Sequence, residues 1–241
     1  PFKLLYKRSY IPYYVYMEVF MRTKSFGFTL AEVLITLGII GIVAAMTLPA
    51  LTAKYKKKEY STRIKKFYSI MLQARQRSTV DNEDPIYWDT PDNNADSLES
   101  WWNKYYAPYF SVLKTEKNAN KLAGCIFLVY FTDGSILGLS KGGAVNLWYD
   151  VNGDIAPNVG GKDRFFFIQT IDGKKNMFTP YNWTADIDST NDKLEDGEEP
   201  FTKNMTDRNN VLRLCAKNSM HCSQLLFLDG WEFKDDYPFN I

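Results

Sequence analysis

The chain has 241 residues, of which 45% are apolar and 24% charged, and its formal net charge is +1. This composition excludes an intrinsically disordered chain, and the small net charge excludes nucleic-acid binding by bulk electrostatics. One histidine, His221, and three cysteines are too few for a Cys/His zinc cluster or for histidine-based acid–base chemistry. We therefore expect no enzyme and no cofactor.

The first 20 residues follow neither the period of a strand nor that of a helix. Met21 then opens a short basic segment, MRTKSFG, which has the character of a leader. We expect the residues up to 27 to be upstream or leader sequence, and we leave them out of the fold.

Residues 28–48 form a run of apolar, small or hydroxylic side chains that is interrupted by one charge, Glu32. At 1.5 Å per residue a helix of this length spans about 31 Å, the thickness of the hydrocarbon core of a bilayer. The run predicts one transmembrane helix. Its orientation is not fixed by charge, because basic residues flank both ends: Arg22, Lys24, Lys54, Lys56, Lys57 and Lys58.

Glu32 would cost about 2.5 kcal/mol or more inside the bilayer, so such a residue usually faces a partner. If the chain were cut between Gly27 and Phe28, a new ammonium group would appear at the same depth. That group of one chain and Glu32 of another would neutralise each other in a medium of low dielectric constant. We interpret Glu32 as an assembly residue.

The segment GFTLAE at residues 27–32, followed by the apolar run, resembles the processing site of type IV prepilins and type II secretion pseudopilins. The resemblance implies that a prepilin peptidase cuts after Gly27, which removes residues 1–27, and that it methylates Phe28. It also implies a role in assembly for Glu32.

Three helix-weakening residues follow Glu32 in the apolar run: Gly38, Gly41 and Pro49. By the same resemblance, the two glycines fall in the stretch that loosens when such filaments assemble, and Pro49 matches a family proline. Each glycine costs a helix about 0.5–1 kcal/mol, and a proline removes one hydrogen bond and kinks it. Ordinary packing glycines of a membrane helix are the alternative.

Beyond Pro49 the pattern becomes amphipathic, with Tyr60, Ile64, Phe67 and Met71 at steps of three and four. We predict one helix over residues 28–78, kinked at Pro49, whose second half lies against a globular domain at 79–241. The basic residues of this half could face solvent, anionic lipid or a neighbouring subunit.

The globular part is expected to begin with a breaker at residues 81–96 and a short helix at 97–106. Because Trp101 and Trp102 are adjacent, we expect at most one of them to point fully inward. Apolar runs bounded by turn residues then predict strands at 125–131, 136–140, 144–150, 164–170 and 224–228, with Asp-Gly turns at 133–134, 172–173 and 229–230. The fold class is α+β, an antiparallel sheet packed on the long helix.

Two further features concern metal binding and cysteine chemistry. Asp150, Asn152 and Asp154 alternate as in oxygen-rich calcium loops, and some major pseudopilins hold calcium in such a loop. The EF-hand pattern fails here, and a loop closed by its own Asx turns is the alternative. Cys215 and Cys222 could close a small disulfide loop in an oxidising compartment, which would leave Cys125 buried and free.

The resemblance implies a non-enzymatic filament subunit, anchored once in the bacterial inner membrane with its globular domain outside the cytoplasm. Its partners would be prepilin peptidase, identical or related subunits and a secretion or pilus assembly platform, without nucleic acid. The alternative is a membrane-anchored module that binds glycans through exposed aromatic side chains. We expect Trp231, Tyr237 and Phe239 to close the core instead.

Overall fold

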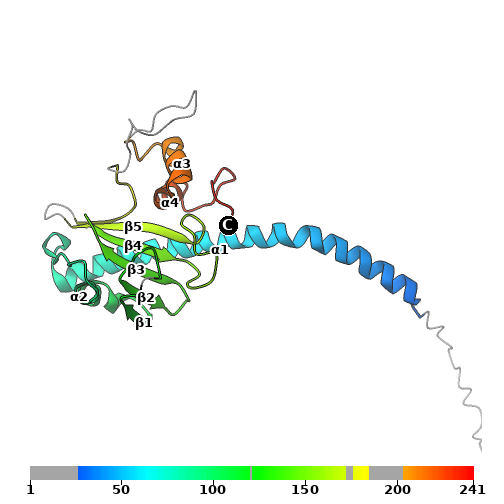
Figure 1. Ribbon diagram of the computed structural model, residues 1–241, viewed down its shortest axis with the longest axis horizontal. Helices are drawn as coiled ribbons and strands as arrows, with labels where there is room; N and C mark the ends of the chain where they lie inside the picture. Colours follow the sequence, from blue (N-terminus) through cyan, green and yellow to red (C-terminus); the bar gives the residue numbers. More distant parts are fainter. Residues whose placement is uncertain (1–26, 120, 172–175, 185–202) are drawn as a thin grey trace, which may run out of the picture. The chain divides into compact units, whose positions relative to one another are not determined.

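The computed structural model of the chain describes residues 27–119, 121–171, 176–184 and 203–241. The segment 1–26 and the turn expected at 172–173 lie outside the described residues. The chain divides into two units, Pro1–Thr47 and Leu48–Ile241, and the boundary falls inside helix α1 (Leu30–Asn82; Figure 1). Helix α1 runs through Pro49, and the kink predicted there stays a prediction.

The second unit is built on a six-stranded antiparallel sheet in which every strand pairs with its neighbour in sequence (Figure 1). The predicted α+β class is therefore confirmed. The strands are β1 (Val112–Lys117), β2 (Phe127–Phe131), β3 (Ile136–Lys141), β4 (Val145–Asp150), β5 (Arg164–Ile171) and β6 (Asn176–Pro180). Short turns join β2 to β3 and β3 to β4, because antiparallel neighbours need no crossover.

The second half of α1 packs against one face of this sheet, as its periodicity predicts. Its buried residues are Tyr60, Ile64, Phe67, Met71, Ala74 and Ser78. At the centre, the ring of Phe67 stacks on that of Tyr149 in β4, with centroids 4.0 Å apart, and meets Phe167 of β5 edge-on at 5.4 Å. Such aromatic pairs add about 0.5–1.5 kcal/mol to the burial of their area.

Helix α2 (Ala95–Tyr105) is capped by Asn94, whose side chain accepts a hydrogen bond from the backbone N–H of Ser97 at 2.8 Å. The expectation that only one tryptophan of this helix is inward is wrong, since Trp101 and Trp102 are both buried. Trp101 packs against Tyr106, while Trp102 packs against Phe110 from the segment that follows. The segment that follows the helix thus covers both rings, which a pattern along the helix does not reveal.

The prediction of a strand at residues 224–228 is wrong, because these residues lie in helix α4 (Cys222–Leu228). Gly230 has φ +69°, and the N–H groups of Trp231 and Gly230 donate to the carbonyls of Leu226 and Phe227. This is a Schellman cap, so the Asp-Gly pair ends a helix here rather than joining two strands.

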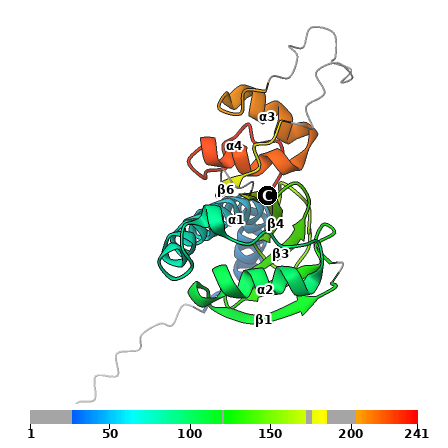
Figure 2. The ribbon, with the colours of Figure 1, turned by 90° about the vertical axis from the view of Figure 1, so that its left-hand side faces the viewer.

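Helix α3 (Arg208–Lys217) and α4 lie together at the β6 end of the sheet, whereas α2 lies at the β1 end (Figure 2). Three short 3-10 turns complete the elements: η1 (Pro85–Tyr87), η2 (Ala107–Tyr109) and η3 (Ser219–His221). Helix α3 and strands β1 and β6 were not predicted from the sequence.

The C-terminal segment closes the core, as predicted. Trp231 and Tyr237 are buried, and the Tyr237 hydroxyl donates to the carbonyl oxygen of Gly161 at 2.7 Å. Phe239 is half-buried and lies so close to Gly161, which has φ +79°, that a Cβ there would approach its ring to 2.7 Å. Only glycine fits that position without displacing the C-terminal segment.

The position of Phe67 makes it the most informative core substitution. Phe67→Ala should lower the free energy of unfolding by about 3–5 kcal/mol, because the sheet cannot collapse into the space. Leu72→Ala is the matched control on the same helix, since Leu72 is 40% exposed. Chemical denaturation of the detergent-solubilised chain, followed by tryptophan fluorescence, measures both. Equal losses for the two variants would contradict this account of the core.

Candidate functional site

The candidate site is the beginning of the described chain, where Gly27 and Phe28 precede helix α1. Residues 27–29 have no regular structure, and the helix begins at Leu30. The Phe28 side chain is 87% exposed. The bond between Gly27 and Phe28 therefore lies in accessible backbone outside the helix, where a peptidase can reach it.

Glu32 has a local partner that the sequence analysis missed. The backbone N–H and the hydroxyl of Thr29 both donate to Glu32 Oε2, at 2.8 and 2.9 Å, and the backbone N–H of Glu32 donates to Thr29 Oγ1 at 3.2 Å. This reciprocal pair is a capping box, with Thr29 at the N-cap and Glu32 three residues on. The signal was present as T-L-A-E before an apolar run.

The cap satisfies hydrogen-bond donors but leaves the charge of Glu32 without a counter-charge. Threonine is neutral, and the described residues contain no ion pair for this carboxylate. The position of Glu32 in the first turn is favourable for a negative charge, because the N-terminal end of a helix is partially positive. Among the described residues, the Glu32 carboxylate therefore has no cation to balance its charge.

The rest of the segment presents apolar side chains in all directions. Between Leu30 and Leu48, every residue is exposed except Ala44, which is half-buried. Among the described residues, α1 is the helix long and apolar enough to cross a membrane by length and composition. The hydroxyls of Thr36 and Thr47 donate to carbonyls one turn back, so they do not oppose burial in an apolar medium.

Gly38 and Gly41 have open space around them. A Cβ built at either residue would meet nothing within 4 Å, so packing within this chain does not require glycine there. Small residues let a second helix approach closely in apolar surroundings. Both glycines, with Glu32 and Pro49, lie on one continuous helix.

The three residues predicted as calcium ligands are held largely by the protein itself. Arg164 Nε donates to Asp150 Oδ2 at 2.8 Å, and the Asn152 amide donates to the carbonyl of Ile155 at 2.7 Å, while Asp154 is exposed. Burial raises the pKa of Asp150 to about 6, and the Arg164 guanidinium opposes that shift. In the described part of the chain, no group of three or more His, Cys, Asp or Glu side chains could hold a metal ion. Calcium binding stays a prediction.

The cysteines occupy the expected arrangement. Cys215 near the end of α3 and Cys222 at the start of α4 form a disulfide, and Cys125 is free and buried. Burial raises the pKa of the Cys125 thiol to about 12, so it stays protonated at neutral pH. His221 is buried beside the ring of Tyr181, at 5.0 Å between centroids. These residues are parts of the core.

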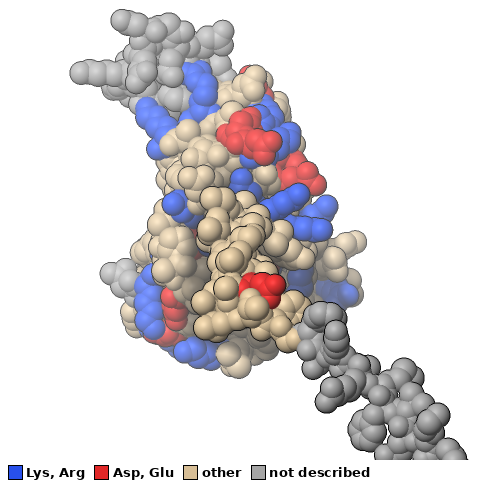
Figure 3. All heavy atoms as spheres, turned by 90° about the vertical axis from the view of Figure 1, so that its right-hand side faces the viewer, with Lys and Arg blue, Asp and Glu red and all other residues tan. Residues whose placement is uncertain are grey.

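The glycan-binding alternative requires a row of exposed aromatic side chains. Four tryptophans are buried and the other two, Trp148 and Trp183, are half-buried. The exposed tyrosines, Tyr55 and Tyr87, belong to different elements, α1 and η1. Basic and acidic side chains are interspersed on the face in Figure 3. The surface of the described residues therefore gives the alternative no support.

Comparison with known proteins assigns both parts of the chain. The model described as "Family of unknown function (DUF6613)" matches residues 50–241, and that of the "Prokaryotic N-terminal methylation motif" matches residues 22–48. No curated protein and no solved structure matches the chain. The second match covers the capping box, the apolar run and the residues on both sides of the Gly27–Phe28 bond.

The capping box can be tested separately from the charge. Thr29→Val removes the hydroxyl that accepts from the Glu32 N–H, which should cost about 1 kcal/mol and raise exchange of that amide about fivefold. Hydrogen exchange in detergent measures this change. Thr36→Val is the matched control, because its hydroxyl only donates one turn back. Unchanged exchange at Glu32 in Thr29→Val would contradict the cap.

Proposed function

The chain belongs to the DUF6613 family, a family of unknown function, and has the amino terminus of a type IV pilin- or pseudopilin-like protein; on that premise we propose that it is a filament subunit. It is a non-enzymatic structural subunit of a type IV pilus-like or type II secretion pseudopilus filament. Prepilin peptidase processes the precursor after Gly27, and the new N-terminal residue, Phe28, is methylated. The observation that carries this proposal is the methylation motif followed by an exposed apolar rod.

The apolar rod supports assembly because it cannot remain in water. Its exposed residues include Leu34, Ile35, Leu37, Ile39, Ile40 and Ile42. Burial of apolar area contributes about 25 cal/mol per Å², so these side chains require either lipid or other helices around them. Before assembly the rod spans the inner membrane, with the globular domain outside the cytoplasm. In the filament, the rods of identical or related subunits cover one another.

Glu32 sets the register between subunits in this proposal. Cleavage creates an amine at Phe28, next to Thr29 and one helical turn before Glu32. The capping box already uses the local donors around Glu32, so the amine that neutralises its charge comes from the neighbouring subunit. Two opposite charges in an apolar medium are each costly alone and attract strongly together.

Processing is tested at the glycine. In a cell that has prepilin peptidase, wild-type protein should begin at Phe28 and carry one added methyl group, whereas Gly27→Ala should retain the residues up to 27. Intact-mass spectrometry of the purified proteins measures both. Gly41→Ala, a glycine-to-alanine change in the helix interior, should be processed normally. Wild-type protein that keeps its leader in such a cell would refute the proposal.

Assembly is tested at the carboxylate with two variants. Glu32→Leu and Glu32→Gln should both insert into the membrane, yet lower the yield of sheared filaments by at least about tenfold, because neither can pair with an amine. Because glutamine keeps the oxygen that accepts the capping hydrogen bonds, Glu32→Gln removes the charge without removing the cap. Immunoblots of membrane and filament fractions give the two yields. Normal filaments from Glu32→Gln would show that the charge has no role in register.

A further inference from the structure

Four lysines follow the apolar run within five residues: Lys54, Lys56, Lys57 and Lys58, here called the basic collar. None of the four forms an ion pair with a described residue, whereas Lys104 and Lys117 elsewhere do, at 2.7 Å from Asp89 and 2.6 Å from Glu99. The nearest acid in sequence, Glu59, is bound by Arg63 at 2.9 Å. Within the described part of the chain, the positive charge of the collar is therefore not taken up by ion pairs.

Two lysines of the collar, Lys54 and Lys58, are exposed and one helical turn apart. They border a shallow hollow of about 580 Å³ together with Leu51 and Tyr55, whose side chains are 53% and 71% exposed. Residues at a membrane–water interface typically combine apolar side chains, amphipathic rings and long cationic side chains. Here the leucine, the tyrosine and the two lysines provide these three kinds of side chain.

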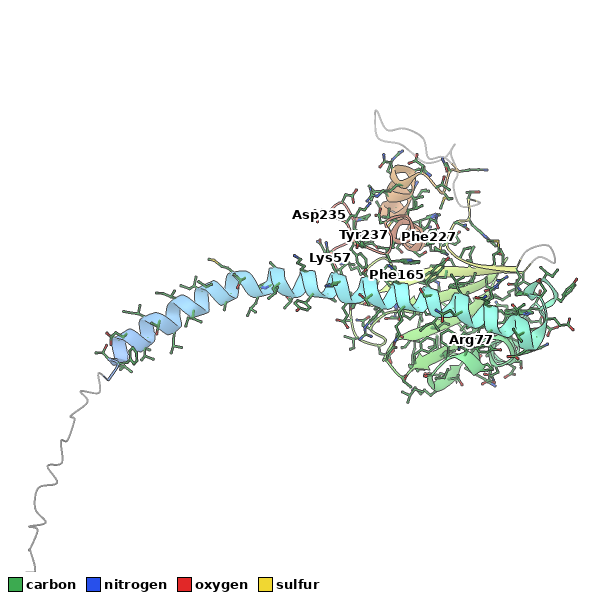
Figure 4. All side chains as sticks on the ribbon, turned by 180° about the vertical axis from the view of Figure 1, so that it is seen from behind. Lys57, Arg77, Phe165, Phe227, Asp235 and Tyr237 are labelled. Atoms are coloured by element: carbon green, nitrogen blue, oxygen red, sulfur yellow. A yellow bond between two sulfur atoms is a disulfide. The ribbon has the colours of Figure 1, made fainter. Side chains whose placement is uncertain are left out.

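The other side of the pair carries acids, and none of them forms an ion pair with Lys54 or Lys58. Lys54 and Lys58 also border a second hollow with Lys57, Glu232 and Asp235. Figure 4 shows Lys57 on α1 beneath the C-terminal segment that carries Asp235. The Leu51–Tyr55 side of the pair contains one acid, Glu59, which Arg63 holds. An anionic ligand is therefore favoured on that side.

If the apolar run spans a bilayer, Lys54 stands at the outer edge of the lipid headgroups and Lys58 lies one helical turn farther out. Along the helix, Lys54 is about 9 Å and Lys58 about 15 Å beyond Leu48, at 1.5 Å per residue. The headgroup layer is about 5–8 Å thick, and a lysine side chain extends several ångströms toward it. A phosphate at the hydrocarbon boundary is thus within reach of Lys54 and within the electrostatic range of Lys58.

We propose that Lys54 and Lys58, with Leu51 and Tyr55, form a binding site for an anionic phospholipid. The Lys54 ammonium group holds the headgroup phosphate and Lys58 attracts it at longer range, while Leu51 and Tyr55 contact the interface. This inference rests on the membrane-spanning part of the proposed function, but on neither processing nor assembly. A neighbouring subunit's acidic side chains would be a different occupant of the same pair.

The test compares phosphatidylglycerol with phosphatidylcholine around the full, uncut chain in phosphatidylcholine bilayers. Trace spin-labelled lipids report a relative association constant by electron paramagnetic resonance. Each lysine near an anionic lipid raises the association constant about fivefold. Phosphatidylglycerol should therefore associate with the wild type at least about fivefold more strongly than phosphatidylcholine does. Lys54→Gln/Lys58→Gln should bring the ratio close to one, whereas Lys54→Arg/Lys58→Arg should keep it.

The matched control is Lys65→Gln/Lys203→Gln, which removes the same charge at two exposed lysines away from the pair and should leave the ratio unchanged. A salt concentration of about 1 M should abolish the preference, since screening then acts over about 3 Å. The proposal is overturned by a wild-type ratio of one, or by an equal loss in the control. It is also overturned if Lys54→Gln/Lys58→Gln keeps the lipid ratio but loses filaments, which would assign the pair to a neighbouring subunit. None of these outcomes bears on the Gly27 or Glu32 tests.

Discussion

The stacking of Phe67 on Tyr149 lies at the centre of the half of the long helix that the sheet covers, and the other half has a different environment. From Tyr60 onward the apolar residues of α1 lie on one stripe, because the sheet covers one side of the helix and water the other. Before Pro49 the helix is apolar all round, so its surroundings have to be apolar on every side. Since both patterns belong to one continuous helix, the chain can cover only the second half itself. The first half depends on lipid or on other chains.

Glu32 combines two physical roles that are usually assigned to different residues. Its carboxylate closes the capping box with Thr29, which satisfies donors that a helix start would otherwise leave unpaired. A glutamine would serve as well in that role. A helix cap does not require a charge. Within an apolar medium, the charge of the carboxylate is costly unless a cation lies beside it. The geometry thus accounts for the position of the residue, and the proposed assembly would account for its charge.

The elements that could be predicted are those whose burial follows from their own sequence. Strands β2 and β5 are dense in aromatic and β-branched residues, and the stripe from Tyr60 to Met71 fits a helix over several turns. Strand β1 was missed because it is an edge strand with mostly exposed, polar residues, including Lys114 and Glu116. The run 224–228 was misassigned because five apolar residues suit a strand or a helix equally, and the Schellman cap at Gly230 makes the difference.

By itself, the sequence determined the membrane-length run, the methylation motif, Glu32 and the amphipathic stripe, because each is a property of neighbouring residues along one chain. It also contained the capping box, although that pattern was overlooked. Only the tertiary structure decided that Trp101 and Trp102 are both buried, that Asp150 pairs with Arg164, and that no lysine of the collar forms an ion pair with a described residue. These outcomes depend on which residues fold back from distant positions, and pairing in space cannot be read from spacing in sequence.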